Sequence, residues 1–325
     1  MGTAINRSTS ANGSSGFWIN FDDPDEYAAA NPRADVRIDN MGSGPFGAPL
    51  GIFDTGTCGV QFSWNREDMV ARASAYEDRF YLLIGPAEPR PWTSLGTPMG
   101  PWSVGLYPGG SANVIRMPSD LELVTLTIEP DAIRRAADDL GLDLKLTTLA
   151  PTILQAAPLP VASIRRFLRH FPRILHNTPA DSSQVKFWMD RTLPRLTARL
   201  LAAEYSSATD DRISSRLRIL NRVEGFLEAN PDTPIYIADL CVAAGVSERT
   251  LENVFRQCFG LSPIRYLRVR RLHQVRRALR TSDPGTTSVS EIASLFGFWH
   301  FGRFAADFKA LFGQTPSELL RHRPA

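Results

Sequence analysis

Two stretches in the C-terminal third hold side chains suited to contacting a nucleic-acid duplex. The sequence ERTLENVFRQ spans residues 248–257, and WHFGRFAADFK spans residues 299–309. Guanidinium groups can bind guanine edges or phosphates, and an asparagine amide fits an adenine edge. The candidate DNA-contacting residues are Arg249, Glu252, Asn253, Arg256, Trp299, His300, Arg303 and Lys309.

Several of these residues have an alternative interpretation. Glu252 could accept a hydrogen bond from a cytosine amino group, or its charge could repel the wrong partner. Trp299 could touch the DNA backbone or pack on a neighbouring helix, and His300 could contact DNA, face solvent or cap a helix. Arg249 is the leading candidate among the eight for a contact with DNA.

We expect a helix to position the candidate residues in each stretch, because apolar residues recur at helical spacing on the opposite face. Leu251 and Phe255 do so in the first stretch, and Phe304 and Phe308 in the second. A short apolar segment ending at a glycine precedes each helix, and Ser247 can cap the first one. Two short helices around such a turn form a helix-turn-helix, whose second helix fits the major groove.

The two stretches belong to an internal repeat that covers about residues 237–259 and 289–312. The offset is 52 residues up to the glycines Gly245 and Gly297, and 53 residues from there to Pro263 and Pro316. One extra residue therefore lies in the second turn. Two copies with matching glycines and prolines argue against an ordinary helical bundle.

A basic segment joins the two copies. Residues 263–281 contain seven arginines and no acidic residue, with an apolar stripe at helical spacing. A helix of this length spans about 28 Å, close to the roughly 34 Å between successive major-groove faces. We expect some of these arginines to meet phosphate and the others to be structural or solvated.

Charge is distributed unevenly along the chain. Residues 211–325 hold 17 Lys and Arg against 11 Asp and Glu, whereas residues 1–210 hold 19 against 23. A basic third behind an acidic remainder is typical of a nucleic-acid module joined to a different domain. The chain has neither a run of 18 apolar residues nor the apolar core of a signal peptide.

Cofactor chemistry finds little support in the sequence. The three cysteines lack metal-ligand spacing, and their odd number suggests a reducing compartment, so we expect a cytoplasmic protein. All five histidines lie beyond residue 169, which argues against a histidine-bound metal in the N-terminal half. We expect no cofactor, no metal and no enzymatic activity, since no catalytic constellation is recognisable.

Short apolar segments alternate with turn signals from about residue 51 to residue 128, as expected of antiparallel strands. We expect an α+β chain with a loosely ordered segment over 1–50 and a β-rich effector-sensing domain over 51–150 that resembles a small barrel or sandwich. A helical connector for dimerisation follows over 151–209. An all-α DNA-binding domain covers 212–325. The candidate effector-binding residues are Trp102, Tyr107 and Arg116.

The region 215–323 resembles the AraC/XylS family of bacterial transcription regulators. The resemblance rests on LCVAAGVSERTLENVFRQCFGLSPIRYLRVRRL, EIASLFGF and FKALFGQTPSELLR. Within it, GFWHFGRF is similar to the ethanolamine-utilisation regulator branch. Asn253 and Ala306 depart from the family, which commonly carries arginine there, so the usual base-reading scheme is in doubt.

The family resemblance implies a regulator that binds double-stranded DNA and contacts RNA polymerase, with an N-terminal region that senses a small molecule or dimerises. We therefore expect a sequence-specific transcription regulator, an activator controlled by an effector or partner, with no membrane association. Two alternatives stay open: a constitutive architectural DNA binder, and an N-terminal enzyme tethered to DNA.

Overall fold

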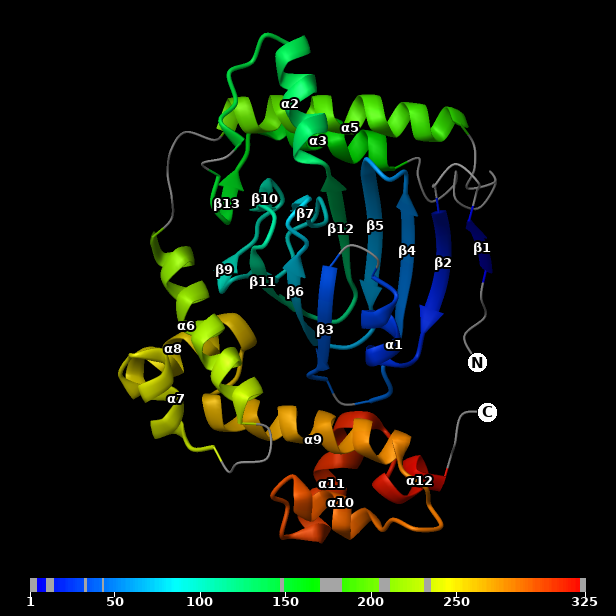
Figure 1. Cartoon of the computed structure of the whole chain (residues 1–325), viewed down its shortest axis with the longest axis vertical. Helices are drawn as coiled ribbons and strands as arrows, with labels where there is room; N and C mark the ends of the chain where they lie inside the picture. The colour runs from blue at the N-terminus through cyan, green and yellow to red at the C-terminus, as the bar shows by residue number, and fades with distance from the viewer. Residues whose placement is uncertain are drawn as a thin grey trace.

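The computed structural model describes residues 5–9, 15–31, 34–42, 44–146, 149–169, 183–204, 211–230 and 235–321. A β-rich N-terminal part precedes a helical C-terminal part (Figure 1). The strands are β1 (Ile5–Thr9), β2 (Ser15–Phe21), β3 (Ala34–Asn40), β4 (Ala48–Asp54), β5 (Cys58–Asn65), β6 (Met69–Ala75), β7 (Phe80–Ile84), β8 (Thr93–Ser94), β9 (Thr97–Pro98), β10 (Ser103–Tyr107), β11 (Ala112–Met117), β12 (Leu121–Ile128) and β13 (Thr152–Gln155). The helices are α1 (Pro24–Ala29), α2 (Pro130–Asp139), α3 (Pro158–Leu168), α5 (Ser183–Glu204), α6 (Asp211–Ala229), α7 (Ile237–Ala244), α8 (Glu248–Phe259), α9 (Pro263–Thr281), α10 (Val289–Leu295), α11 (Phe301–Phe312) and α12 (Pro316–Arg321).

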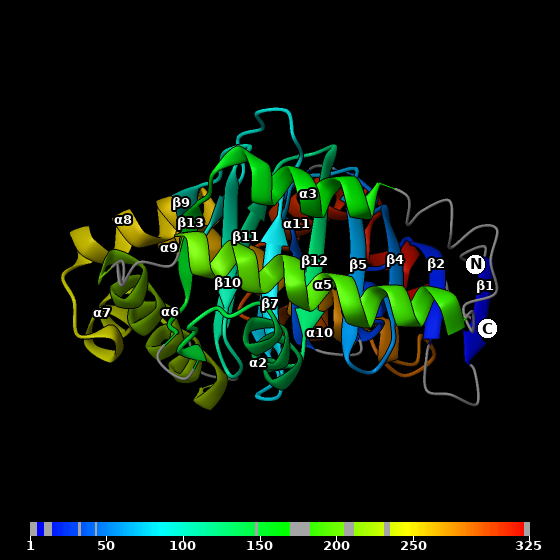
Figure 2. The same cartoon turned by 90° about the horizontal axis from the view of Figure 1, so that it is seen from above.

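The described strands form two open sheets, and neither closes into a barrel. One has the order β1-β2-β4-β5-β12-β7-β10-β13, and the other has the order β3-β6-β11-β8-β9. Successive side chains of a strand point to opposite faces of the sheet, so β12 contributes side chains to two hydrophobic cores. Its Leu121 and Leu123 pack with the smaller sheet, whereas Leu126 and Ile128 pack with α2, α3 and α5. Figure 2 shows α5 crossing the strands of the larger sheet.

The predicted fold class, a β-rich N-terminal part before an all-α C-terminal part, is confirmed. The expectation of a loosely ordered segment over residues 1–50 is wrong for its described part. β2 pairs with β4 and β3 pairs with β6, so long-range ladders order a stretch that has little local pattern. The helical connector expected over 151–209 contains α3 and α5, but it also includes β13, which pairs with β10.

The C-terminal helices occupy two different cores. α6 to α8 and the start of α9 share a core with the two sheets, whereas the rest of α9 packs with α10, α11 and α12. α9 begins and ends at the residues that the sequence predicts for the connector, and it runs beneath the strands in Figure 1. The β-rich part therefore packs directly against the first module and the connector.

Candidate nucleic-acid interface

The first helix-turn-helix consists of α7 and α8. Gly245 ends α7 with φ 69° and ψ 36°, the left-handed conformation that glycine adopts most easily. Ser247 caps α8, as predicted, by accepting a hydrogen bond of 3.3 Å from the Thr250 amide. α8 buries Leu251 and Phe255 and turns its polar side outward. Local signals thus set the exposed face of this helix.

The second helix-turn-helix consists of α10 and α11. Ser288 and Glu291 form a reciprocal capping box at the start of α10. α11 buries Phe304 and Phe308 and is tied to α9 by an ion pair between Asp307 and Arg268. The connector α9 thus holds the second recognition helix through this ion pair as well as through the apolar core that it shares with α10, α11 and α12.

Six of the eight candidate DNA-contacting residues lie on the outward sides of α8 and α11. Arg249, Asn253, Arg256, Arg303 and Lys309 are exposed, and Glu252 is half-buried. In α8 the nitrogen Nη2 of Arg256 donates to Glu252 at 3.1 Å, and Nε2 of Gln257 donates to Asn253 at 3.2 Å. Within the described part of the chain, Arg249 and Arg303 have no ion-pair partner, so both guanidinium groups are available to a ligand.

Trp299 and His300 lie just outside the second recognition helix. α11 begins at Phe301, so His300 takes the N-cap position and Trp299 belongs to the turn. The extra residue of the second repeat lengthens this turn. Trp299 is 73% exposed and lines a groove with Tyr236, Ile264 and Arg303. Its packing on α9 is therefore slight, and the indole faces the gap between the two modules.

Most of the α9 arginines contact protein. The guanidinium groups of Arg276, Arg277 and Arg280 pair with acidic residues of α1. Arg270 lies near Glu224 of α6, Arg268 pairs with Asp307, and Arg271 donates to the Ile235 carbonyl. Among the seven, Arg265 alone has a side chain without a partner in the described residues. Of the two roles expected for these arginines, the contacts support the structural one for six of the seven, and they leave Arg265 as the candidate for a phosphate contact.

The acidic partners on α1 are residues that sequence reasoning missed. Asp23 caps α1 and pairs with both Arg276 and Arg280. Asp25 binds Arg276 at 3.2 Å, and Glu26 binds Arg280 at 3.0 Å. We call Asp23, Asp25 and Glu26 the α1 acidic cluster. Figure 1 shows α1 directly above α9. More than 240 residues separate the partners, so no spacing in the sequence signals the contact.

The β-rich part contacts both modules. Nη1 of Arg216, on α6, donates to the Leu95 carbonyl at 2.9 Å and to the Thr97 hydroxyl at 3.0 Å, beside the first module. Nδ2 of Asn40 donates to the Leu311 carbonyl of α11 at 3.2 Å. The β-rich part thus contacts α6 beside the first module and α11 within the second.

The structure does not bring the three candidate effector-binding residues together. Tyr107 is buried between the sheets, where its hydroxyl lies 2.5 Å from Ser94 Oγ. Trp102 lies on the outside, below the guanidinium of Arg165 at 5.4 Å. Arg116 lies against the turn between α8 and α9, close to Gly260. The cavity beside Tyr107 has a volume of about 70 Å³, too small for most organic ligands.

Within the described part of the chain, the helices are too short or too polar to cross a membrane. Nor do its His, Cys, Asp and Glu side chains gather into a group of three that could hold a metal ion.

Two helix-turn-helix motifs joined by one helix, each with an exposed polar recognition helix, define the class of double helix-turn-helix DNA-binding proteins. Residues 240–322 match the family described as "Helix-turn-helix domain". The chain is 40% identical over 99 residues to the probable thc operon regulatory protein of Rhodococcus erythropolis, covering 30% of each chain. It is 33% identical over 126 residues to the XylDLEGF operon transcriptional activator of Pseudomonas putida, covering 39% of each chain.

A solved structure, that of the AraC-like transcriptional activator CuxR, is similar at 18% identity and a TM-score of 0.40, covering 77% of this chain and 89% of that one. The C-terminal region of the chain is thus similar to the helix-turn-helix regions of AraC/XylS-type transcription regulators. The similarity spans 30–39% of the length of the two curated relatives.

Proposed function

We propose that this protein is a sequence-specific transcription activator that presents α8 and α11 to two successive major-groove segments of its operator. The observation that carries the proposal is the pair of exposed recognition helices on one rigid connector. Arg249 and Arg303 are the proposed base or phosphate contacts, and the longer second turn brings Trp299 and His300 toward the DNA backbone.

The N-terminal domain is the proposed regulatory part. It contacts α6 through Arg216, α9 through the α1 acidic cluster and α11 through Asn40. A ligand that alters any of these contacts changes how the two recognition helices are presented, and this differential affinity is what control requires. RNA polymerase and a second copy of the chain are further proposed partners. Phe187 and Trp188 of α5 support the second copy, because both are exposed aromatic side chains.

Fluorescence anisotropy on the DNA upstream of its own gene, over a salt series, tests the DNA-binding part of this proposal. Scrambled DNA of equal length is the comparison. We expect Arg249→Ala and Arg303→Ala each to weaken binding by about 1–3 kcal/mol and to reduce the preference for native sequence. Arg134→Ala, which removes an exposed arginine of α2, is the matched control and should leave affinity unchanged.

Equal affinity for native and scrambled DNA would contradict sequence recognition and would indicate an architectural binder. A loss of affinity in Arg303→Ala that is uniform across sequences, with a smaller salt slope, would assign that residue to phosphate rather than base contact.

A further inference from the structure

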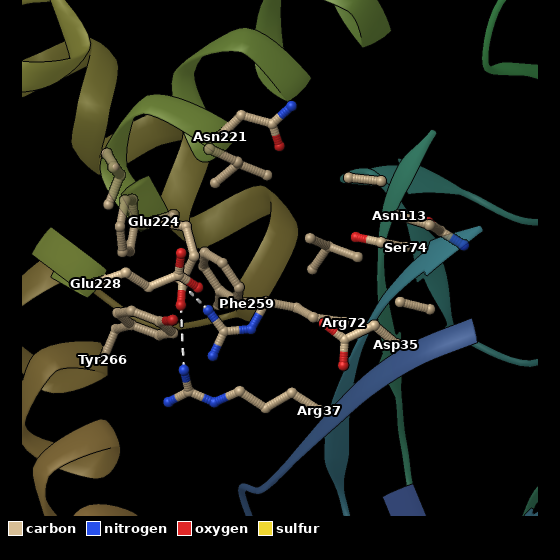
Figure 3. Close-up of a pocket in the computed structure, with 16 residues that line it drawn as sticks. Asp35, Arg37, Arg72, Ser74, Asn113, Asn221, Glu224, Glu228, Phe259 and Tyr266 are labelled. Carbon is tan, nitrogen blue, oxygen red and sulfur yellow. Dashed lines mark hydrogen bonds and ion pairs between the residues drawn. The ribbon is translucent and has the colours of Figure 1, made fainter. Parts of the chain in front are cut away.

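A cavity of about 230 Å³ lies between the smaller sheet and helices α6, α8 and α9. Arg37 of β3 and Arg72 of β6 are direct partners in the antiparallel pair, so two like charges stand side by side. Both reach the carboxylate of Glu224 on α6, Arg37 at 3.1 Å and Arg72 at 2.6 Å. Figure 3 shows these three side chains pointing toward one another at the cavity.

The ion-pair network beside this cavity holds more positive than negative groups. The guanidinium groups of Arg37 and Arg72 at the cavity, and that of Arg270 behind it, share the carboxylates of Asp39 and Glu224. Burial disfavours the charged form of Asp39, yet Arg72 and Arg37 hold its pKa well below the usual range. One positive charge remains in excess. A buried charge without a counterion is costly, so the site favours a further anion.

Hydrogen-bond donors at the cavity also lack acceptors. Within the described residues, the Tyr266 hydroxyl has no hydrogen-bond partner, although the side chain is only 1% exposed and lines the cavity. The nitrogens Nη2 of Arg37 and Nε of Arg72 are likewise unpaired. Burial raises the pKa of Tyr266 to about 12, so its hydroxyl keeps its proton and can donate. Buried donors are normally paired, which indicates room for an acceptor.

The rest of the lining combines the polar residues Ser74, Asn113 and Asn221 with apolar side chains, among them Phe255 and Phe259 of α8. The volume is below the roughly 300–1,000 Å³ of pockets that hold drug-sized ligands, so the occupant must be small. Asp35 and Glu228, also among the lining residues, are exposed, and water screens their charge.

We propose that this cavity binds a small organic carboxylate, with its head on Arg37, Arg72 and Tyr266 and its apolar body against the α8 phenylalanines. The ligand carboxylate competes with Glu224 of α6 for the guanidinium groups of Arg37 and Arg72. It thereby weakens the contact between α6 and the sheet and changes the position of the first module. Its role as effector rests on the function proposed above, whereas its binding does not.

Isothermal titration calorimetry of the full chain without DNA tests the site, with phenylacetate and hexanoate as probes and uncharged phenylacetamide as the comparison. We expect saturable binding of phenylacetate and at least tenfold weaker binding of the amide. Arg37→Gln should weaken phenylacetate binding at least tenfold, and Tyr266→Phe should weaken it severalfold while the chain stays folded. Arg216→Gln removes a different arginine beside the sheet and should bind like wild type.

Absence of saturable binding of both carboxylates up to about 10 mM would overturn the proposal, as would equal binding of the amide. Undiminished binding by a folded Arg37→Gln or Tyr266→Phe protein would overturn it too. Anisotropy on operator DNA is measured separately. A chain that binds DNA but no carboxylate refutes only this site, and one that binds carboxylate but no DNA refutes only the DNA-binding proposal.

Discussion

At the scale of single residues, His273 is a buried histidine whose charge the fold excludes. The side chain is 1% exposed, its Nε2 lies 3.3 Å from the Asn40 carbonyl, and its ring meets Phe312 edge-on at 5.0 Å. Burial lowers the pKa of His273 to about 4, although Asp39 opposes the shift. The unfolded chain, with a histidine pKa near 6.5, therefore binds a proton here more readily than the folded chain does.

This difference predicts a pH-dependent stability. The contribution of His273 is complete above about pH 6.5 and is lost as the pH falls toward 4, because protonation then favours the unfolded chain. Between pH 7 and 4.5 the loss amounts to about 2 kcal/mol. Urea unfolding of wild type and His273→Gln at both pH values measures this contribution to the free energy of unfolding, since the other groups titrate alike in the two proteins. Equal pH dependence of both would contradict the prediction.

At the scale of elements, the turns of the DNA-binding region depend on individual glycines. Gly245 ends α7 in the left-handed conformation, where a Cβ is strained. Gly225 lies inside α6, is exposed, and has open space where a Cβ would be. The same substitution should therefore act in opposite directions at the two positions.

We expect Gly245→Ala to lower the free energy of unfolding by about 1–2 kcal/mol, and Gly225→Ala to raise it by about 0.5–1 kcal/mol through helix propensity. Urea denaturation followed by circular dichroism measures both. Destabilisation by Gly225→Ala would contradict the prediction and would show that α6 does not tolerate a Cβ at residue 225.

The elements also show what the sequence could and could not predict. Caps, glycines and apolar spacing act within a few residues, so α7 to α11 could be placed from the sequence alone. The strands of residues 15–54 depend on ladders with distant partners, and their local composition suggested disorder instead. The cavity between domains joins Arg37, Arg72 and Glu224, which are close only after folding. No local pattern could reveal it.

At the scale of the whole molecule, the α1 acidic cluster joins the N-terminal domain to the connector. The side chains of Asp23 and Arg276 are 5% and 7% exposed, so their ion pair is largely shielded from water. The breaking of a buried pair from one side leaves an uncompensated charge. Surface pairs of the same kind contribute little.

We expect Asp23→Asn to destabilise the chain by about 2–4 kcal/mol, while asparagine still caps α1. Asp131→Asn breaks the exposed pair with Arg134 and should cost less than about 0.5 kcal/mol. Urea unfolding monitored by tryptophan fluorescence compares the two variants. Equal small effects would show that the domains do not depend on this contact.

The contact between α1 and α9 also limits how such a protein can be recombined. A hybrid gene that joins this N-terminal domain to the helix-turn-helix region of another regulator would supply Asp23 without its guanidinium partners. The hybrid would then carry a buried, unmatched carboxylate at the junction between its two parents. A working hybrid of this chain must therefore take its crossover point after α9, or transplant Arg276, Arg277 and Arg280 together with the N-terminal domain.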